Sequence, residues 1–303
     1  MKENILIIPS EPSKMLLKMI ESAVEDNNIL KISELTVDED LKNKNILLAI
    51  ELNSIGTNNN LNLMLEKLTQ RGLNSLIDSE ASILIHSNYN NFTKTYAQQV
   101  IYLMNRLGCR FPGRPIVEAN ENLDNFIAMQ KIYDLPLEEI LLMKSQELGR
   151  KLFSEQQFYR NKNIVAIHSS NKETSNTLML WDMVKNNLKD LYVKDINLGN
   201  GKITDCRGCG YKTCKYFGKQ SKCYYGGIIV EEVYPSILDS STIVFLCPNY
   251  NDMLTANIVA TINRLTALFR KTKFYDKRIF GVIVSGYSGS DALSKQLISS
   301  LNI

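Results

Sequence analysis

The sequence predicts an α/β protein built from doubly wound parallel sheets and divided into two related domains. Short apolar runs alternate with helical stretches along the chain, which is the pattern of a parallel sheet. Similar segments also recur about 160 residues apart: residues 4–10 resemble residues 163–169, and residues 83–90 resemble residues 244–251. Ordered matches at a nearly constant separation indicate a duplicated unit. We therefore expect domains at residues 1–155 and 156–303.

The predicted elements follow the same alternation in both domains. In the second domain we expect strands at 163–168, 192–198, 242–247 and 279–285, and helices at 174–189, 228–237, 253–271 and 290–301. The first domain runs similarly from residue 5 to residue 119, and a helical stretch at 123–153 follows it. Ligands bind parallel sheets at the carboxyl ends of the strands, so the loops after Ile167, Leu246 and Val284 should converge on one site.

Composition excludes several classes of protein. Thirty-five basic and 32 acidic residues give a net charge of +3, too small to predict nucleic acid as a partner. The apolar runs are far shorter than the roughly 20 residues that cross a membrane. Four of the six cysteines lie between residues 206 and 223, which favours a local ligand set over a disulfide framework. The sequence predicts a cytoplasmic protein.

The loop after the first strand of the second domain reads Ser169-Ser-Asn-Lys-Glu-Thr-Ser-Asn-Thr177 and opens a helix. Backbone N–H groups and the helix dipole favour a phosphate at such a position. The loop has no glycine to admit a dinucleotide pyrophosphate, so a monophosphate is favoured. An ordinary capped helix start, with Thr174 or Ser175 as the cap, is the alternative.

Three motifs in order resemble the flavodoxin-like NADPH-dependent FMN reductases, and within them the iron-sulfur flavoproteins. The loop above is similar to the family's phosphate loop, although His168 replaces a glycine and Asn171 an arginine. Cys247-Pro-Asn-Tyr-Asn-Asp252 resembles the loop that holds the flavin ring, and Ser285-Gly-Tyr-Ser-Gly289 resembles a third, glycine-rich loop. The resemblance implies that FMN is bound by Ser169, Asn171, Ser175, Asn176, Thr177, Pro248, Asn249, Tyr250, Asn251, Ser285, Gly286, Tyr287 and Gly289.

The cysteine loop holds Cys206, Cys209, Cys214 and Cys223. Thiolates suit a [4Fe-4S] cluster or zinc, and a single short Cys-x2-Cys pair with many neighbouring lysines favours the cluster. Reduced structural cysteines without metal are the third interpretation. Iron-sulfur flavoproteins have a similar arrangement, with a tighter spacing of the third and fourth cysteines.

These observations predict an NAD(P)H-dependent FMN oxidoreductase that passes electrons to a small-molecule or protein acceptor. A non-enzymatic electron carrier and a zinc-stiffened flavin-binding module are the alternatives. The first domain has Ser10-Glu-Pro-Ser13 in place of the phosphate loop, and Glu11 would repel a phosphate, so we expect a degenerate copy. A fifth strand after residues 279–285 is not evident, and that apolar edge predicts a homodimer.

Overall fold

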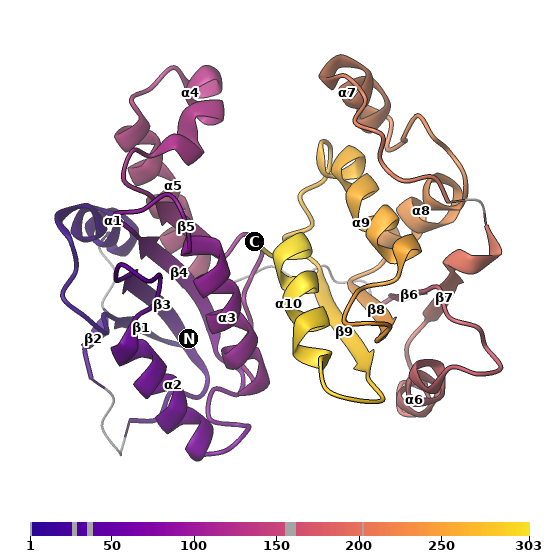
Figure 1. Cartoon of the computed structure of the whole chain (residues 1–303), viewed down its shortest axis with the longest axis horizontal. Coiled ribbons are helices and arrows are strands. Elements are labelled where there is room, and N and C mark those ends of the chain that lie inside the picture. Colours follow the sequence, from indigo (N-terminus) through magenta and orange to yellow (C-terminus); the bar gives the residue numbers. More distant parts are fainter. Residues whose placement is uncertain (1, 26–28, 35–38, 155–161, 202) are drawn as a thin grey trace. The chain divides into compact units, whose positions relative to one another are not determined.

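The structure, a computed structural model, describes residues 2–25, 29–34, 39–154, 162–201 and 203–303. The chain forms two compact units, residues 1–156 with 302–303 and residues 157–301. The domain boundary predicted at residue 155 lies within 155–161, outside the described residues. Each unit is a parallel sheet flanked by helices, so the predicted flavodoxin-like α/β fold is confirmed (Figure 1).

The first unit has a five-stranded parallel sheet in the order β2-β1-β3-β4-β5. Leu16 of α1 and Ile140 of α5 pack with Leu47 on one face, and Met64 of α2 and Met104 of α3 lie against the other. The elements are β1 (Glu3–Ile7), α1 (Lys14–Val24), β2 (Leu30–Ile32), β3 (Lys44–Glu51), α2 (Asn59–Gln70), β4 (Glu80–His86), α3 (Thr93–Arg106), β5 (Ile116–Ala119), a short 3-10 helix (Asp124–Phe126), α4 (Ile127–Tyr133) and α5 (Leu137–Phe153).

The second unit has a four-stranded parallel sheet in the order β7-β6-β8-β9. Trp181 of α6 packs on one face, while α8, α9 and α10 pack on the other. The elements are β6 (Ile164–His168), α6 (Asn176–Lys185), β7 (Val193–Asn197), a short 3-10 helix (Leu198–Asn200), α7 (Tyr211–Lys219), a π-helical turn (Ile229–Val233), α8 (Tyr234–Asp239), β8 (Thr242–Pro248), α9 (Ala256–Phe269), β9 (Arg278–Val284) and α10 (Ser290–Leu301).

Sheet position corrects one detail of the predicted repeat. The pairing of residues 83–90 with residues 244–251 matches β4 to β8, yet β8 is the third strand of its domain in chain order and corresponds to β3. The ends of β1 and β6, Ile7 and His168, are 161 residues apart, whereas the ends of β3 and β8, Glu51 and Pro248, are 197 apart. The separation grows because the cysteine-bearing segment lies between β7 and β8. That segment also contains α7, which the sequence interpretation took as loop.

β9 of the second sheet is more exposed than the strand at the equivalent place in the first sheet. β9 is the terminal strand, and its Ile279 and Phe280 side chains are 40% and 54% exposed. In the first unit the strand at the equivalent place, β4, is buried along its length because β5 pairs with it. Among the described residues, the second unit has neither an equivalent of β5 nor a second helix on the α6 face.

Candidate functional site

Three loops meet at the carboxyl end of the second sheet, as the parallel topology requires. They are residues 169–175 after β6, residues 249–255 after β8 and residues 285–289 after β9, and we call them the first, second and third loops. The Ser169 hydroxyl lies 2.6 Å from the Thr255 hydroxyl, which joins the first loop to the second. The Asn249 amide donates to the Ser285 hydroxyl at 2.9 Å, which joins the second to the third. The loops therefore form one continuous surface.

The first loop leads into the N-terminus of α6. The Ser175 hydroxyl caps this helix by accepting the Leu178 N–H at 3.3 Å. The N–H groups of Asn176 and Thr177 come before the capped one, where an α-helix has no internal acceptors for them. Asn171 makes a local turn in which its side-chain oxygen accepts the Glu173 N–H. The positive end of the helix dipole is thus directed at the site.

Ser170 is the residue that sequence reasoning missed. Its side chain is only 3% exposed, and its hydroxyl has no hydrogen-bond partner. A buried hydroxyl without a partner is costly, and such groups are rare in folded proteins. Ser170 lies in the loop that leads into α6, and its hydroxyl is enclosed, so a phosphate oxygen would supply the missing partner only after a movement of this loop. No local sequence pattern distinguishes Ser170 from the neighbouring Ser169, because the difference between them is burial, which depends on packing.

His168 contributes no positive charge to this loop. Burial lowers the pKa of His168, although Asp195 acts in the opposite direction. Its Nδ1 atom accepts the Ser170 N–H at 3.3 Å, so the ring proton is on Nε2. The neutral ring orients the backbone of the loop, and the dipole of α6 and the hydroxyl groups are left to attract an anion.

The second and third loops are held together by Asn249, which is buried. Its side chain donates to Asp252 at 3.0 Å and accepts the Asp252 N–H at 2.8 Å. Asn251 and Asp252 both have positive φ angles, of 58° and 57°, which asparagine and aspartate tolerate better than most residues. Gly289 has a φ of +107°, and a Cβ atom there would lie 1.8 Å from the Asp252 carboxylate. The close approach of the two loops therefore requires glycine.

Two tyrosines stand at the rim of these loops. Tyr250 and Tyr287 are 62% and 58% exposed, and the Tyr287 hydroxyl accepts the Asn251 N–H at 3.1 Å. Tyr250 is thus not packed into the edge of the sheet. Pro248 ends β8 and pairs with Val284, and Gly286 has open space where a Cβ atom would lie. Two aromatic rings, backbone polar groups and a helix N-terminus therefore lie at the same end of the sheet, where its strands have their carboxyl ends.

The four cysteines are spread through their loop. Within the described residues, no three histidine, cysteine, aspartate or glutamate side chains are grouped closely enough to hold a metal ion. Cys206 is exposed, the Cys209 thiol donates to the Tyr225 hydroxyl at 3.7 Å, and Arg270 donates to the Cys214 sulfur at 3.3 Å. In this arrangement the chain does not fit a cluster or a zinc ion without movement of the loop.

The buried Arg264 of α9 anchors the ends of this cysteine loop. Its guanidinium group donates to the Thr204 carbonyl at 3.1 Å and to the Gly226 carbonyl at 2.7 Å. Sequence reasoning missed this role, because the partners of Arg264 are backbone carbonyls far from it in the sequence, and no local pattern identifies them. Cys247, at the end of β8, is fully buried, and burial raises the pKa of its thiol to about 12. Cys247 is therefore a packing residue and not a reactive thiolate.

Comparison with known proteins supports the family that the motifs suggested. Residues 162–303 match the family model of NADPH-dependent FMN reductase. A comparison with curated proteins finds no match. Among solved structures, the chain is similar to the crystal structure of RosB with the bound intermediate OHC-RP, 8-demethyl-8-formylriboflavin-5'-phosphate. That likeness has 14% sequence identity and a TM-score of 0.34 over 69% of this chain and 96% of RosB, and it establishes no ligand for this chain.

Proposed function

We propose that the chain is an FMN-dependent NAD(P)H oxidoreductase whose flavin lies on the three loops of the second domain. The match of residues 162–303 to NADPH-dependent FMN reductase supports an oxidoreductase of this kind. The observation that carries the proposal is the joining of three polar loops at the N-terminus of α6, whose first N–H groups have no acceptor within the helix. A phosphate monoester is a ligand that these N–H groups and the helix dipole favour.

The candidate residues fall into two groups, one that would contact the phosphate of the flavin and one that would contact its ring. Ser169, Ser170 and the N–H groups of Asn176 and Thr177 would hold the phosphate. Asn171 and Ser175 shape that loop through their hydrogen bonds to backbone N–H groups. The second and third loops would meet the ring with the backbone of Pro248, Asn249, Asn251, Ser285, Gly286 and Gly289 and with the rings of Tyr250 and Tyr287.

FMN, if bound there, would supply hydride and electron transfer between NAD(P)H and an acceptor. The chain's part is to orient the flavin and to keep the phosphate end fixed. We propose a small molecule or a protein as the electron acceptor. A pure electron carrier is the second candidate. Tyr250 and Tyr287 are exposed, and a flavin ring beside them would be open to a protein partner, which favours this candidate.

Anaerobic stopped-flow mixing with NADPH and with NADH separates these candidates. If the protein is an oxidoreductase, NADPH or NADH should reduce the flavin, and bleach its absorbance, within the time of one catalytic turnover. The nucleotide that reduces the flavin faster is then the cosubstrate. Slow reduction by both nucleotides would support the carrier. The double variant Asn176→Ala, Thr177→Ala tests the phosphate loop through the same flavin signal, and we expect weaker FMN binding. Unchanged affinity would contradict the placement of the phosphate.

We also propose that the cysteine loop binds a [4Fe-4S] cluster, as in iron-sulfur flavoproteins, with zinc as the alternative. The four cysteines lie within one short segment, and Arg207, Lys212 and Lys215 would offset the charge of thiolate ligands. Because the described thiols are not assembled, metal binding would have to rearrange the loop, as in other sites where binding and folding are coupled.

Assembly and location are also proposals. β9 is the terminal strand of its sheet, and a second copy of the chain would cover the exposed apolar side chains of Ile279 and Phe280. We therefore propose a homodimer. No helix in the described part of the chain is long and apolar enough to cross a membrane. The clustered cysteines, which need reducing conditions to stay free, support a cytoplasmic location.

A further inference from the structure

We propose that the first domain has a ligand site of its own, in which the Nε2 atom of His86 accepts a hydrogen bond from a small neutral molecule. The site lies at the carboxyl ends of β1, β3 and β4. The strand order of this sheet reverses between β1 and β3, which is where ligands bind in doubly wound folds. The first domain would then be more than a degenerate copy of the second.

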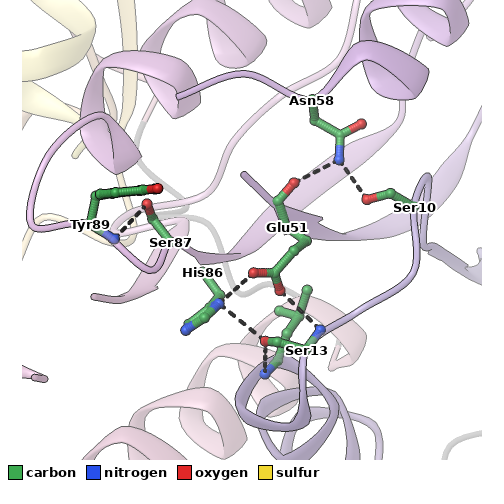
Figure 2. A network of polar contacts seen from close by, with 8 residues as sticks. Ser10, Ser13, Glu51, Asn58, His86, Ser87 and Tyr89 are labelled. Carbon is green, nitrogen blue, oxygen red and sulfur yellow. Dashed lines mark hydrogen bonds and ion pairs between the residues drawn. The ribbon is translucent and has the colours of Figure 1, made fainter. Parts of the chain in front are cut away.

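A network of polar contacts holds the site together (Figure 2). The His86 Nδ1 atom lies 2.6 Å from the Glu51 carboxylate and 3.1 Å from the Ser13 hydroxyl. The Ser13 N–H donates to the same carboxylate at 3.0 Å. Asn58 donates to the Ser10 hydroxyl at 2.7 Å and to the Glu51 carbonyl at 2.8 Å, which fixes the loop after β1 against the loop after β3. The network therefore holds the His86 ring in place through contacts within the chain.

The carboxylate of Glu51 decides which ring nitrogen of His86 carries the proton. Burial alone would raise the pKa of Glu51, but the hydrogen bonds from His86 and Ser13 lower it, so the group is ionised at neutral pH. An ionised carboxylate only accepts hydrogen bonds, so Nδ1 must be the donor. With the proton held on Nδ1, Nε2 is the nitrogen that has the lone pair in the uncharged form of an imidazole ring, and that lone pair accepts a hydrogen bond.

The Nε2 atom is the open position of this network. His86 is only 5% exposed, yet among the described residues Nε2 has no hydrogen-bond partner. The side-chain atoms that are fully enclosed and also lack a partner do not include Nε2. This nitrogen is therefore accessible from the surface. Figure 2 shows this nitrogen directed away from Glu51 and Ser13. A buried ring that is held by its other nitrogen and left open at this one is arranged to meet a ligand.

Charge determines the class of ligand. The Glu51 carboxylate accepts the Ser13 N–H next to the N-terminus of α1, where the second domain has its proposed phosphate loop. A negative side chain thus occupies the place of an anion and would repel a phosphate. The strand that corresponds to β3 in the second domain ends in Pro248 and carries no such charge. The ligand we propose is therefore uncharged and donates from a hydroxyl or a ring N–H group.

The test uses the full-length protein and the nuclear magnetic resonance signals of its imidazole nitrogens. The chain has only His86 and His168, so both rings are resolved in one long-range proton–nitrogen spectrum. His86 should carry its proton on Nδ1 and His168 on Nε2, because the Nδ1 of His168 accepts the Ser170 N–H. Four probes are then titrated at millimolar concentration: ribose, uracil, 1,3-dimethyluracil and inorganic phosphate.

We expect ribose or uracil, which donate from hydroxyl and N–H groups respectively, to shift the Nε2 signal of His86. 1,3-Dimethyluracil has no N–H group and should leave it unchanged, and phosphate should do the same. A shift of this signal by phosphate would overturn the proposal, as would the absence of a shift with both donor probes. A His86 ring that carries its proton on Nε2 would also overturn it.

The variant Glu51→Gln tests the role of the carboxylate. The Gln side chain can donate to Nδ1, so the ring proton should move to Nε2 and the dissociation constant of the donor probe should rise about tenfold or more. Unchanged His168 signals and a cooperative thermal transition would show that the variant is folded. If the folded variant binds the donor probe as well as the wild type does, the inference is wrong. FMN binding in the second domain is scored separately by flavin fluorescence.

Discussion

Substitution of Ser170 by alanine should stabilise the protein without flavin and weaken its binding of FMN. The Ser170 hydroxyl is buried and unpartnered, so its removal relieves a desolvation cost of about 1–3 kcal/mol in the free protein. If the hydroxyl donates to the phosphate, its loss costs a charge-assisted hydrogen bond of about 1.5–3 kcal/mol in the complex. That loss corresponds to a dissociation constant about 10 to 150 times higher.

Two measurements on the same preparation test both effects. Urea unfolding of the flavin-free protein gives the free energy of unfolding, and quenching of flavin fluorescence gives the affinity for FMN. Ser169→Ala is the matched control for stability alone, because its hydroxyl already has a partner in Thr255 and its removal should lower the stability of the free protein. Its affinity for FMN is no control, since Ser169 belongs to the proposed phosphate site. A Ser170→Ala protein that is less stable and binds FMN with unchanged affinity would refute our reasoning about this hydroxyl.

Further predictions concern other parts of the chain. Gly289→Ala should lower the free energy of unfolding by about 1–3 kcal/mol and weaken FMN binding, because φ is +107° and Asp252 blocks the new Cβ atom; Gly286→Ala, which has open space, should change little in the same urea titrations. The pKa of Glu51 is lowered, so its stabilisation is present above the ordinary glutamate pKa and is lost as the pH falls through the lowered value; the stability difference between the wild type and Glu51→Gln should shrink on acidification. Anaerobic reconstitution should give about four irons and four sulfides per chain, lost in Cys206→Ser, whereas zinc without iron would disprove the cluster. Light scattering at micromolar concentration should show a dimer that Phe280→Lys disrupts, and a monomeric wild type would contradict pairing through β9.

The sequence alone determined the fold class and the order of the loops. Alternating apolar runs and helical stretches specify parallel strands with helices between them, because each period reflects one local backbone geometry. Parallel strands end at a common edge, so this alternation by itself places the loops after β6, β8 and β9 together. The sequence also offered Thr174 or Ser175 as a helix cap, as the alternative to a phosphate loop, since a short polar side chain before a helix meets the backbone nearby. Ser175 is the residue that caps α6.

Only the tertiary structure decided which strands correspond and which polar atoms lack partners. Local similarity matched β4 to β8, but hydrogen-bonded strand order, which depends on residues distant in sequence, matches β3 to β8. Burial of Ser170 depends on what packs over it, and the contact between Glu51 and His86 joins residues 35 positions apart. Likewise, four cysteines close in sequence need not bring their sulfur atoms together, as the described residues of the loop show. Partners and burial are properties of the packed chain, so no local pattern in the sequence specifies them.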